Sequence, residues 1–350
     1  MVDILDLLKL AVDNHASDVH ISVGTTPTVR LHGELRSVGS EPLTMEDALQ
    51  MVKRLINEAQ WEKLQERGEL DFSYSLPGVS RFRVNAYRQR GNYSLAVRTI
   101  PMQVPAFESL GLPEVVRAFA DKHQGLVLVT GPTGSGKSTT LASLIAYINQ
   151  TKKRHIITLE DPIEYLHRHN KSVIDQREIG FDTMSFSNGL RAALRQDPDV
   201  VLVGEMRDLE TIGTAITAAE TGHLVFATLH TPDAPQSVDR MIDVFPPGQQ
   251  QQVRVQLAGV LLGIVSQRLL QGADGKSRVA SVEILVNTPA VSNLIRSEKI
   301  HQIRTTMQTG KAFGMQTMEM SLRELLAKRL ITDAQFKEIA SEWSGFASLN

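Results

Sequence analysis

The sequence contains no cysteine and few aromatic residues. None of the 350 residues is a cysteine, which excludes disulfides, thiolate zinc sites and a thiol nucleophile together. Aromatic residues make up 5% of the chain, and 39 acidic residues nearly balance 37 basic ones. A basic or aromatic track for nucleic acid is therefore not indicated, and any anion-binding site must be local. The absence of thiols fits a cytoplasmic protein.

Long hydrophobic runs are missing as well. The first residues, MVDILDLLKLAVDNHASD, carry acids among the apolar positions and lack the basic start of a signal peptide. The most apolar later stretch, residues 257–270, is shorter than the ~20 residues of a membrane helix, and Gln267 and Arg268 interrupt it. We expect a soluble chain without a transmembrane segment.

The hydrophobic pattern changes near residue 100. Alternation of apolar and polar residues predicts antiparallel strands at 29–31, 70–76, 82–86 and 93–97. Helical spacing predicts flanking helices around residues 2–15 and 44–66, so we expect an α+β domain over residues 1–99. Three prolines within residues 100–113 indicate a linker, after which a second domain extends over residues 114–350.

Short apolar runs alternate with helical patterns in this second domain. The runs lie at residues 126–130, 155–159, 200–203 and 224–228. Such runs are typical of parallel strands that helices cover on both faces, which predicts an α/β domain. Helical spacing prevails from Pro246 onward and predicts a mainly helical C-terminal part. The positions that carry it include Val253, Leu257, Val260, Leu261, Ile264 and Val265.

Residues 131–138, GPTGSGKS, match the complete phosphate-loop pattern between a predicted strand and a predicted helix. In such a loop the backbone amides converge on phosphate oxygens, Lys137 reaches the outer phosphates, and the Ser138 hydroxyl can bind magnesium. A solvated glycine-rich loop is the alternative, and the flanking strand and helix disfavour it. The predicted nucleotide contacts are Gly131, Thr133, Gly134, Ser135, Gly136, Lys137, Ser138 and Thr139.

Acidic residues follow two of the apolar runs. Glu205 comes shortly after residues 200–203, where an acid can act on the magnesium water or on the attacking water. An acid merely exposed at the end of a strand is the alternative. After the run at 155–159, the segment ITLEDPIEY places Glu160, Asp161 and Glu164 close together. Carboxylates this close need water, a cation or a phosphate-bound metal among them.

The order of these acids along the chain does not assign their roles. Pro162 resists helix and favours a turn, so helical spacing cannot sort the carboxylates.

Two histidines and three arginines complete the candidates. His223 and His230 bracket the last apolar run, and their odd separation would turn them to opposite sides of an unbroken strand. Purely structural histidines are the alternative. Arg81 and Arg83 share one face of a predicted strand, and Arg98 lies on the next strand. These arginines either line a solvated face or reach a phosphate of a neighbouring subunit.

Four ordered segments resemble the motifs of the secretion ATPase superfamily of bacterial type II secretion and type IV pilus motors. They are GPTGSGKSTT, ITLEDPIEY, DPDVVLVGEMRDLET and TAAETGHLVFATLHT, which resemble its Walker A, Asp, Walker B and His boxes in that order. The similarity extends from residues 16–22 to residues 314–322. Within the superfamily the sequence is most similar to the pilus retraction ATPases. Extension and secretion members typically carry an additional N-terminal domain and often a tetracysteine zinc module, whereas this chain begins with the smaller domain.

The resemblance implies a homohexamer whose subunits each have a PAS-like N-terminal domain and a RecA-like ATPase domain. It implies ATP and Mg²⁺ as cofactors, and hydrolysis of ATP that powers pilus retraction and twitching motility. The implied place is the cytoplasmic face of the inner membrane, with the pilus platform protein as partner and no nucleic acid. Type II secretion and pilus assembly ATPases are alternatives from the same superfamily. A RecA-like nucleic-acid motor and a nucleotide-gated assembly protein without hydrolysis remain further alternatives.

The resemblance also implies roles for individual residues. It assigns His223 and His230 to the His box, and Arg83 and Arg98 to the arginines that reach the nucleotide, with Arg81 in reserve. Among the acids, Glu164 would polarise the attacking water and share that work with Glu205. Glu160 and Asp161 would hold the water shell of magnesium or the turn, and Ser138 and Glu205 would complete the magnesium site.

One segment departs from the family pattern. Retraction ATPases carry a signature close to AIRNLIRE, whereas residues 290–297 read AVSNLIRS. Ser292 and Ser297 each replace a charged residue, a change that bears on coupling to the pilus machinery and not on ATP hydrolysis.

Overall fold

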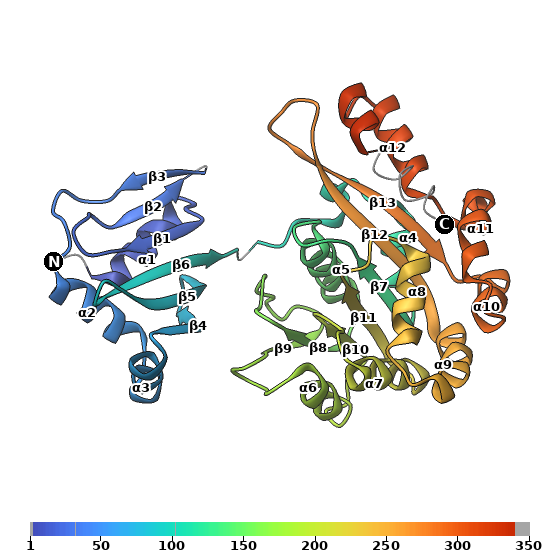
Figure 1. Ribbon diagram of the computed structural model, residues 1–350, viewed down its shortest axis with the longest axis horizontal. Helices are drawn as coiled ribbons and strands as arrows, with labels where there is room; N and C mark the ends of the chain where they lie inside the picture. Colours follow the sequence, from blue (N-terminus) through green and yellow to red (C-terminus); the bar gives the residue numbers. More distant parts are fainter. Residues whose placement is uncertain (1–2, 32, 102, 340–350) are drawn as a thin grey trace. The chain divides into compact units, whose positions relative to one another are not determined.

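The computed structural model describes residues 3–339 except 32 and 102, and these residues form two compact units (Figure 1). The first unit contains residues up to 103 together with 164–166. The second contains 104–163 and the chain from 167 onward. Among the described residues, no helix combines the length and the apolar character needed to cross a bilayer.

The first unit is an antiparallel sheet with helices packed against it. Its six described strands lie in the order β3-β2-β1-β6-β5-β4. They are β1 (Asp18–Ile21), β2 (Thr28–Leu31), β3 (Glu34–Ser37), β4 (Glu69–Leu76), β5 (Ser80–Gln89) and β6 (Asn92–Ile100). The predicted meander over β4, β5 and β6 is confirmed. It forms because Phe82, Val84 and Ala86 alternate with polar residues and bury one face of β5.

Helices cover the buried face of this sheet. They are α1 (Ile4–Asp13), α2 (Met45–Leu55) and α3 (Glu58–Arg67). The single helix expected over residues 44–66 is interrupted, because Asn57 is extended and starts α3 with a capping box to Gln60. The apolar side chains of α1 and α2 share one buried cluster with β5 and β6.

The second unit is built on a mostly parallel sheet of seven described strands, in the order β13-β12-β7-β11-β10-β8-β9. They are β7 (Gly125–Thr130), β8 (His155–Glu160), β9 (Val173–Glu178), β10 (Val200–Val203), β11 (Leu224–Leu229), β12 (Leu261–Gln271) and β13 (Arg278–Val286). Pairing is parallel from β12 through β9, and β13 pairs antiparallel with β12. The four predicted apolar runs are therefore β7, β8, β10 and β11.

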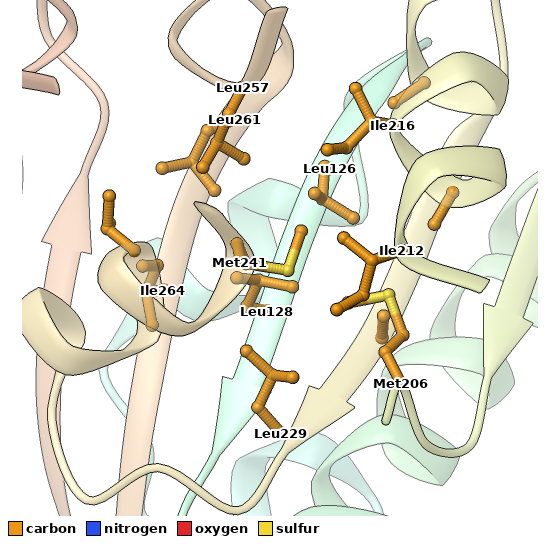
Figure 2. Packing of buried hydrophobic residues seen from close by; sticks show 14 of the residues in the cluster. Leu126, Leu128, Met206, Ile212, Ile216, Leu229, Met241, Leu257, Leu261 and Ile264 are labelled. Carbon is orange, nitrogen blue, oxygen red and sulfur yellow. The ribbon is translucent and has the colours of Figure 1, made fainter. Parts of the chain in front are cut away.

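Helices cover both faces of this sheet. They are α4 (Glu114–Phe119), α5 (Lys137–Thr151), α6 (Phe186–Ala193), α7 (Leu209–Glu220), α8 (Ala234–Asp243) and α9 (Pro247–Val260). Figure 2 shows Leu126 and Leu128 of β7 packed with Ile212 of α7 and Met241 of α8. The alternate residues Val127 and Val129 belong to a second cluster with α4 and α5. Burial on both faces explains why β7 is apolar at every position.

The prediction of a helix through Leu261, Ile264 and Val265 is wrong. Helix α9 ends at Val260, and the chain then becomes β12, which pairs with β7 and β13. This run is apolar on every side, so its periodicity cannot separate a buried strand from a buried helix. Helices follow the β12–β13 hairpin. They are α10 (Pro289–Arg296), α11 (Ile303–Thr309), α12 (Met318–Ala327) and the 3₁₀ turns η2 (Ile300–Gln302) and η3 (Lys311–Phe313).

The proline-rich segment after β6 carries the 3₁₀ turn η1 (Phe107–Leu110). Phe107 is 5% exposed and packs in the α4–α5 cluster of the second unit. The Ser143 hydroxyl of α5 donates to the Pro105 carbonyl at 2.6 Å. The second half of this segment is thereby attached to the second unit.

Candidate nucleotide site

The phosphate loop connects β7 to α5 through glycines in conformations that other residues avoid. Gly131 and Gly136 have φ angles of 139° and 89°. An added Cβ on Gly131 would lie 2.3 Å from the Gln267 carbonyl oxygen, and one on Gly136 would lie 2.6 Å from Gln267 Nε2. Gly131 therefore requires glycine for space as well as for backbone angle, whereas at Gly136 the backbone angle is the main requirement, since the Gln267 side chain could shift. Gln267 of β12 therefore lies next to both of these glycines.

The loop has the features of an anion site. Gly136 precedes the first residue of α5, and no described side chain caps that helix, which leaves its first amides available to phosphate. The Ser135 hydroxyl is buried and has no hydrogen-bond partner among the described residues. Ser138 is exposed and Thr139 half-buried at the start of α5, where their hydroxyls can meet a bound nucleotide. The predicted loop residues thus fit a nucleoside triphosphate.

Lys137 folds back over the loop. Its ammonium donates to the carbonyl oxygens of Gly131 at 2.7 Å and Pro132 at 2.9 Å. Burial lowers the pKa of Lys137, and the negative charge of Glu205 opposes that shift. The ammonium is therefore held beside the loop amides, within the electrostatic reach of Glu205.

Glu205 and His230 meet at the same edge of the sheet. Glu205 follows β10 and His230 follows β11, and these strands are parallel neighbours. His230 Nε2 lies 3.1 Å from Glu205 Oε1, and the Arg207 guanidinium donates to the same oxygen. That hydrogen bond raises the pKa of Arg207. Glu205 is thereby held by two basic groups.

An open cavity of about 580 Å³ connects these groups with the phosphate loop. Its lining residues are Thr133, Glu205, Met206, Arg207, Leu229, His230, Thr231 and Arg240. Sequence reasoning predicted Thr133, Glu205 and His230, and it missed Arg207 and Arg240, which no motif spacing singled out. The cavity places an acid, a histidine and basic groups next to the phosphate loop.

The acids after β8 occupy the edge beside Glu205. The Gly204 amide donates to the Leu159 carbonyl at 2.7 Å, so the ends of β10 and β8 are in register. Glu160 is half-buried, and its Oε1 accepts from Thr158 at 2.7 Å and from Gln176 at 3.0 Å. Asp161 is exposed, and its charge contributes to the raised pKa of Arg207.

Strand β8 ends at Glu160, the chain bends at Asp161 and Pro162, and no helix follows in the described segment, so the prediction that EDPIE is not a helix face is confirmed. Glu164 is exposed and groups with the first unit, so its role at the phosphate loop stays a prediction.

The predicted magnesium ligands fit a nucleotide-bound ion and not a self-sufficient metal cage. Among the described residues, no three His, Cys, Asp or Glu side chains gather into a metal site. Mg²⁺ in nucleotide sites takes most ligands from phosphates and water, with one or two from protein. The exposed Ser138 hydroxyl and the carboxylates of Glu205, Glu160 and Asp161 supply ligands of the kind that Mg²⁺ prefers.

His223 lies at the opposite edge of the sheet from His230. It precedes β11, and its carbonyl accepts from Gly125 at the start of β7 at 3.0 Å. Its Nδ1 is 2.9 Å from the Ala218 carbonyl near the end of α7. The six residues of β11 span about 20 Å. The structure therefore does not bring His223 to the phosphate loop of its own chain.

The candidate arginines lie on the face of β5 and β6 that is turned away from the buried cluster. Arg83 is directly opposite Arg98, and both are exposed. Arg98 Nε lies 3.1 Å from Asp18 Oδ1 on β1, and Arg81 is half-buried. These residues belong to the first unit, so their contact with a nucleotide stays a prediction.

Gln267 is a site residue that sequence reasoning missed. It is 3% exposed, and its Oε1 accepts from the Thr140 hydroxyl of α5 at 2.8 Å. A glutamine inside an apolar run was visible in the sequence, and only the pairing of β12 with β7 shows that it contacts the phosphate loop.

Comparisons with known proteins agree with this geometry. Residues 2–341 match the family described as type II/IV secretion system protein. The chain is 48% identical over 339 residues to PilT, the type IV pilus retraction ATPase of Pseudomonas aeruginosa, covering 97% of this chain and 98% of that protein. It is 50% identical over 328 residues to a twitching motility protein of Neisseria gonorrhoeae, covering 94% and 88%.

A solved structure is similar as well. The crystal structure of the pilus retraction motor PilT with bound ADP matches with a TM-score of 0.90 and 49% identity, covering 97% of both chains. The chain therefore belongs to the type II/IV secretion system protein family, and over nearly its whole length it is similar to the pilus retraction ATPase PilT.

Proposed function

We propose that this chain is the ATP-hydrolysing motor of type IV pilus retraction, acting as a homohexamer at the cytoplasmic face of the inner membrane. The observation that carries the ATPase assignment is the cavity where the phosphate loop, Glu205 and His230 meet. The retraction role is supported by the near-complete coverage of PilT at 48% identity. The partner that receives the work is the platform protein of the pilus.

The chemistry follows from the charges around the cavity. Lys137 and the loop amides would bind the β- and γ-phosphates, and Ser138 with the acids at the strand ends would hold Mg²⁺. When bound, the metal would supply positive charge to the phosphate oxygens. Water attacks the γ-phosphorus, the bond to the bridging oxygen breaks, and Glu205 orients that water together with Glu164. His230 and Arg207 keep the Glu205 carboxylate in place.

Arginines of a neighbouring subunit complete the site. Arg83 and Arg98 are exposed on neighbouring strands, directly opposite each other. Positive charge placed next to the γ-phosphate stabilises the transition state of phosphoryl transfer. We assign them to the nucleotide of the adjacent subunit, with Arg81 in reserve. Closure of the ring would then turn nucleotide binding into movement of one domain against another.

The ATPase assignment is tested by phosphate release. Lys137→Ala should lose nucleotide binding and turnover, and Glu205→Gln should bind ATP and hydrolyse it at least 100-fold more slowly, about the effect of losing a transition-state group. Lys122→Ala, which removes an exposed lysine outside the site, is the control and should keep normal activity. Wild-type turnover in Lys137→Ala would refute the phosphate-loop assignment. Stimulation by DNA would favour a nucleic-acid motor.

The arginines and the acids need separate tests. Mixed rings of Arg83→Ala and Lys137→Ala subunits should regain part of the activity, because some interfaces contain both intact halves. No rescue in verified mixed hexamers would argue against arginines in trans. If Glu160→Gln is inactive and Glu164→Gln is normal, Glu160 polarises the water.

Coupling to pili is tested in the source organism. Deletion of the gene should leave pili on the surface and abolish twitching.

Ser292 is 8% exposed, and its hydroxyl donates to the Ala258 carbonyl at 2.9 Å, whereas Ser297 is exposed. Of these two departures from the family signature, Ser297 is therefore the one that faces outward for a partner.

A further inference from the structure

A buried carboxylate joins the first turns of two helices in the second unit. Glu283 of β13 is 2% exposed, and its Oε1 accepts from the Ala234 amide at 2.9 Å. The amide of Met318 also donates to this carboxylate. Ala234 is the first residue of α8, and Met318 is the first residue of α12. The Glu283 carboxylate thus accepts hydrogen bonds from two backbone amides that have no partner within their own helices.

The first of these helices begins shortly after His230. Asp233 caps α8 by accepting from the Gln236 amide at 2.8 Å. The Thr231 and Ser237 hydroxyl oxygens are 2.6 Å apart, and Ser237 donates to the Asp233 carbonyl at 2.6 Å. The segment from Thr231 into α8, which directly follows His230, is therefore one hydrogen-bonded unit. Glu283 ties that unit to the sheet.

The same hairpin supports the phosphate loop. Glu283 is opposite Ser266 of β12, and the Ser266 hydroxyl accepts from Thr130, the last residue of β7, at 2.9 Å. Gln267, the next residue of β12, contacts the loop from behind. Strands β12 and β13 therefore contact both the phosphate loop and the start of α8, the helix that follows His230.

Opposing interactions act on the pKa of Glu283. Burial raises its pKa to about 7, and the nearby Asp233 carboxylate adds to that shift. The two helix amides and Arg304 of α11 act in the opposite direction. A charged acceptor makes stronger hydrogen bonds to amides than a neutral one. Near neutral pH, a change in protonation therefore changes how firmly both helices are held.

We propose that Glu283 is a positioning residue for the ATPase reaction, which fixes His230 against Glu205 by holding the first amide of α8. The inference rests on the proposed ATPase function. Glu283 touches neither nucleotide nor water in this role. Its effect on turnover passes through the first turn of α8.

The test is a pH profile of ATP hydrolysis by the full-length protein. Glu283→Gln keeps the size of the side chain and removes its charge. We expect kcat to fall about tenfold at pH 8, the effect of roughly one weakened charged hydrogen bond, with KM for ATP changed less than twofold. In the wild type, kcat should rise as pH passes through about 7, and this rise should be absent from the variant.

A matched control separates positioning from general loosening. Ser281 of β13 is buried, and its hydroxyl donates to Met318 Sδ at 3.1 Å and to Ser321 Oγ at 3.2 Å, both in α12. Ser281→Ala disturbs α12 and leaves α8 in place, so its pH profile should follow the wild type. Circular dichroism and urea unfolding verify that both variants are folded.

The outcomes distinguish this inference from the proposed function. If the wild type does not hydrolyse ATP, the proposed function fails and the inference fails with it. If the wild type is active and Glu283→Gln keeps both its kcat and its rise near pH 7, only the role of Glu283 is refuted. If Ser281→Ala also loses the rise, the effect belongs to α12 and the assignment to His230 is wrong.

Discussion

Alanine at Gly131 should damage the second unit far more than alanine at Gly134, although both glycines lie in the same phosphate loop. Both have positive φ angles, 139° and 81°, where alanine costs about 1–2 kcal/mol. An added Cβ on Gly134 meets no described atom within 4 Å, whereas one on Gly131 lies 2.3 Å from the Gln267 carbonyl oxygen. Ordinary contact begins at 3.4 Å, so β7 and β12 would have to separate by about 1 Å.

The expected magnitudes follow from these distances. Overpacking of a core costs about 1–3 kcal/mol, so Gly131→Ala should lower the free energy of unfolding by about 2–5 kcal/mol in total. Gly134→Ala should lower it by about 1–2 kcal/mol. Urea unfolding followed by circular dichroism measures both, and a fluorescent ATP analogue reports nucleotide affinity. Equal shifts in the two variants would refute the steric reasoning, since backbone angle alone would then account for both.

Three further variants test other parts of the structure. Gln267→Leu should lower the free energy of unfolding by about 1–3 kcal/mol, because it leaves the buried Thr140 hydroxyl without its acceptor, and should raise KM for ATP. Arg98→Ala should change stability by less than about 1 kcal/mol in urea unfolding, since the Arg98 side chain is exposed and Asp18 keeps its ion pair with Arg30, while ATP turnover falls if Arg98 acts in trans. Ser292→Arg should destabilise the chain by about 1–3 kcal/mol because the site is buried against α9, and Ser297→Glu should stay within about 0.5 kcal/mol. Similar melting temperatures for these last two variants would contradict the burial assigned to Ser292.

The phosphate loop and the parallel strands were predictable because their requirements are local. The spacing of Gly131, Gly134 and Gly136 reflects backbone angles within the loop. The runs that became β7 and β11 are apolar because both faces of the sheet are covered. The loop glycines and the apolar runs are each visible within a few consecutive residues, so sequence alone predicted this part of the fold.

The β12–β13 hairpin was not predictable in the same way. Residues 257–265 are apolar on all sides, and either a helix or a strand could bury them. Residues 261–266 form a strand because they pair with β7, which lies far away in the sequence. The roles of Gln267 and Glu283 depend on that pairing and were hidden with it.

The histidines show a related limit of sequence patterns. His223 and His230 belong to one motif, yet they occupy opposite ends of β11. The carboxyl ends of parallel strands meet at one side of the sheet and the amino ends at the other, so His230 after β11 joins Glu205 and His223 before β11 does not. Arg83 and Arg98 belong to the other unit, so their contact with a nucleotide stays a prediction.

The pairing of β12 with β7 also governs how the chain can be divided. If the chain were cut after α9, β7 would keep β11 on one side and lose β12 on the other. It would then be an unprotected edge strand with a row of unpaired amides and carbonyls. Such edges recruit strands from other molecules and promote aggregation. Fragments that keep the phosphate loop without residues 261–286 should therefore be insoluble, so the smallest fragment that folds as an ATPase has to retain the C-terminal hairpin.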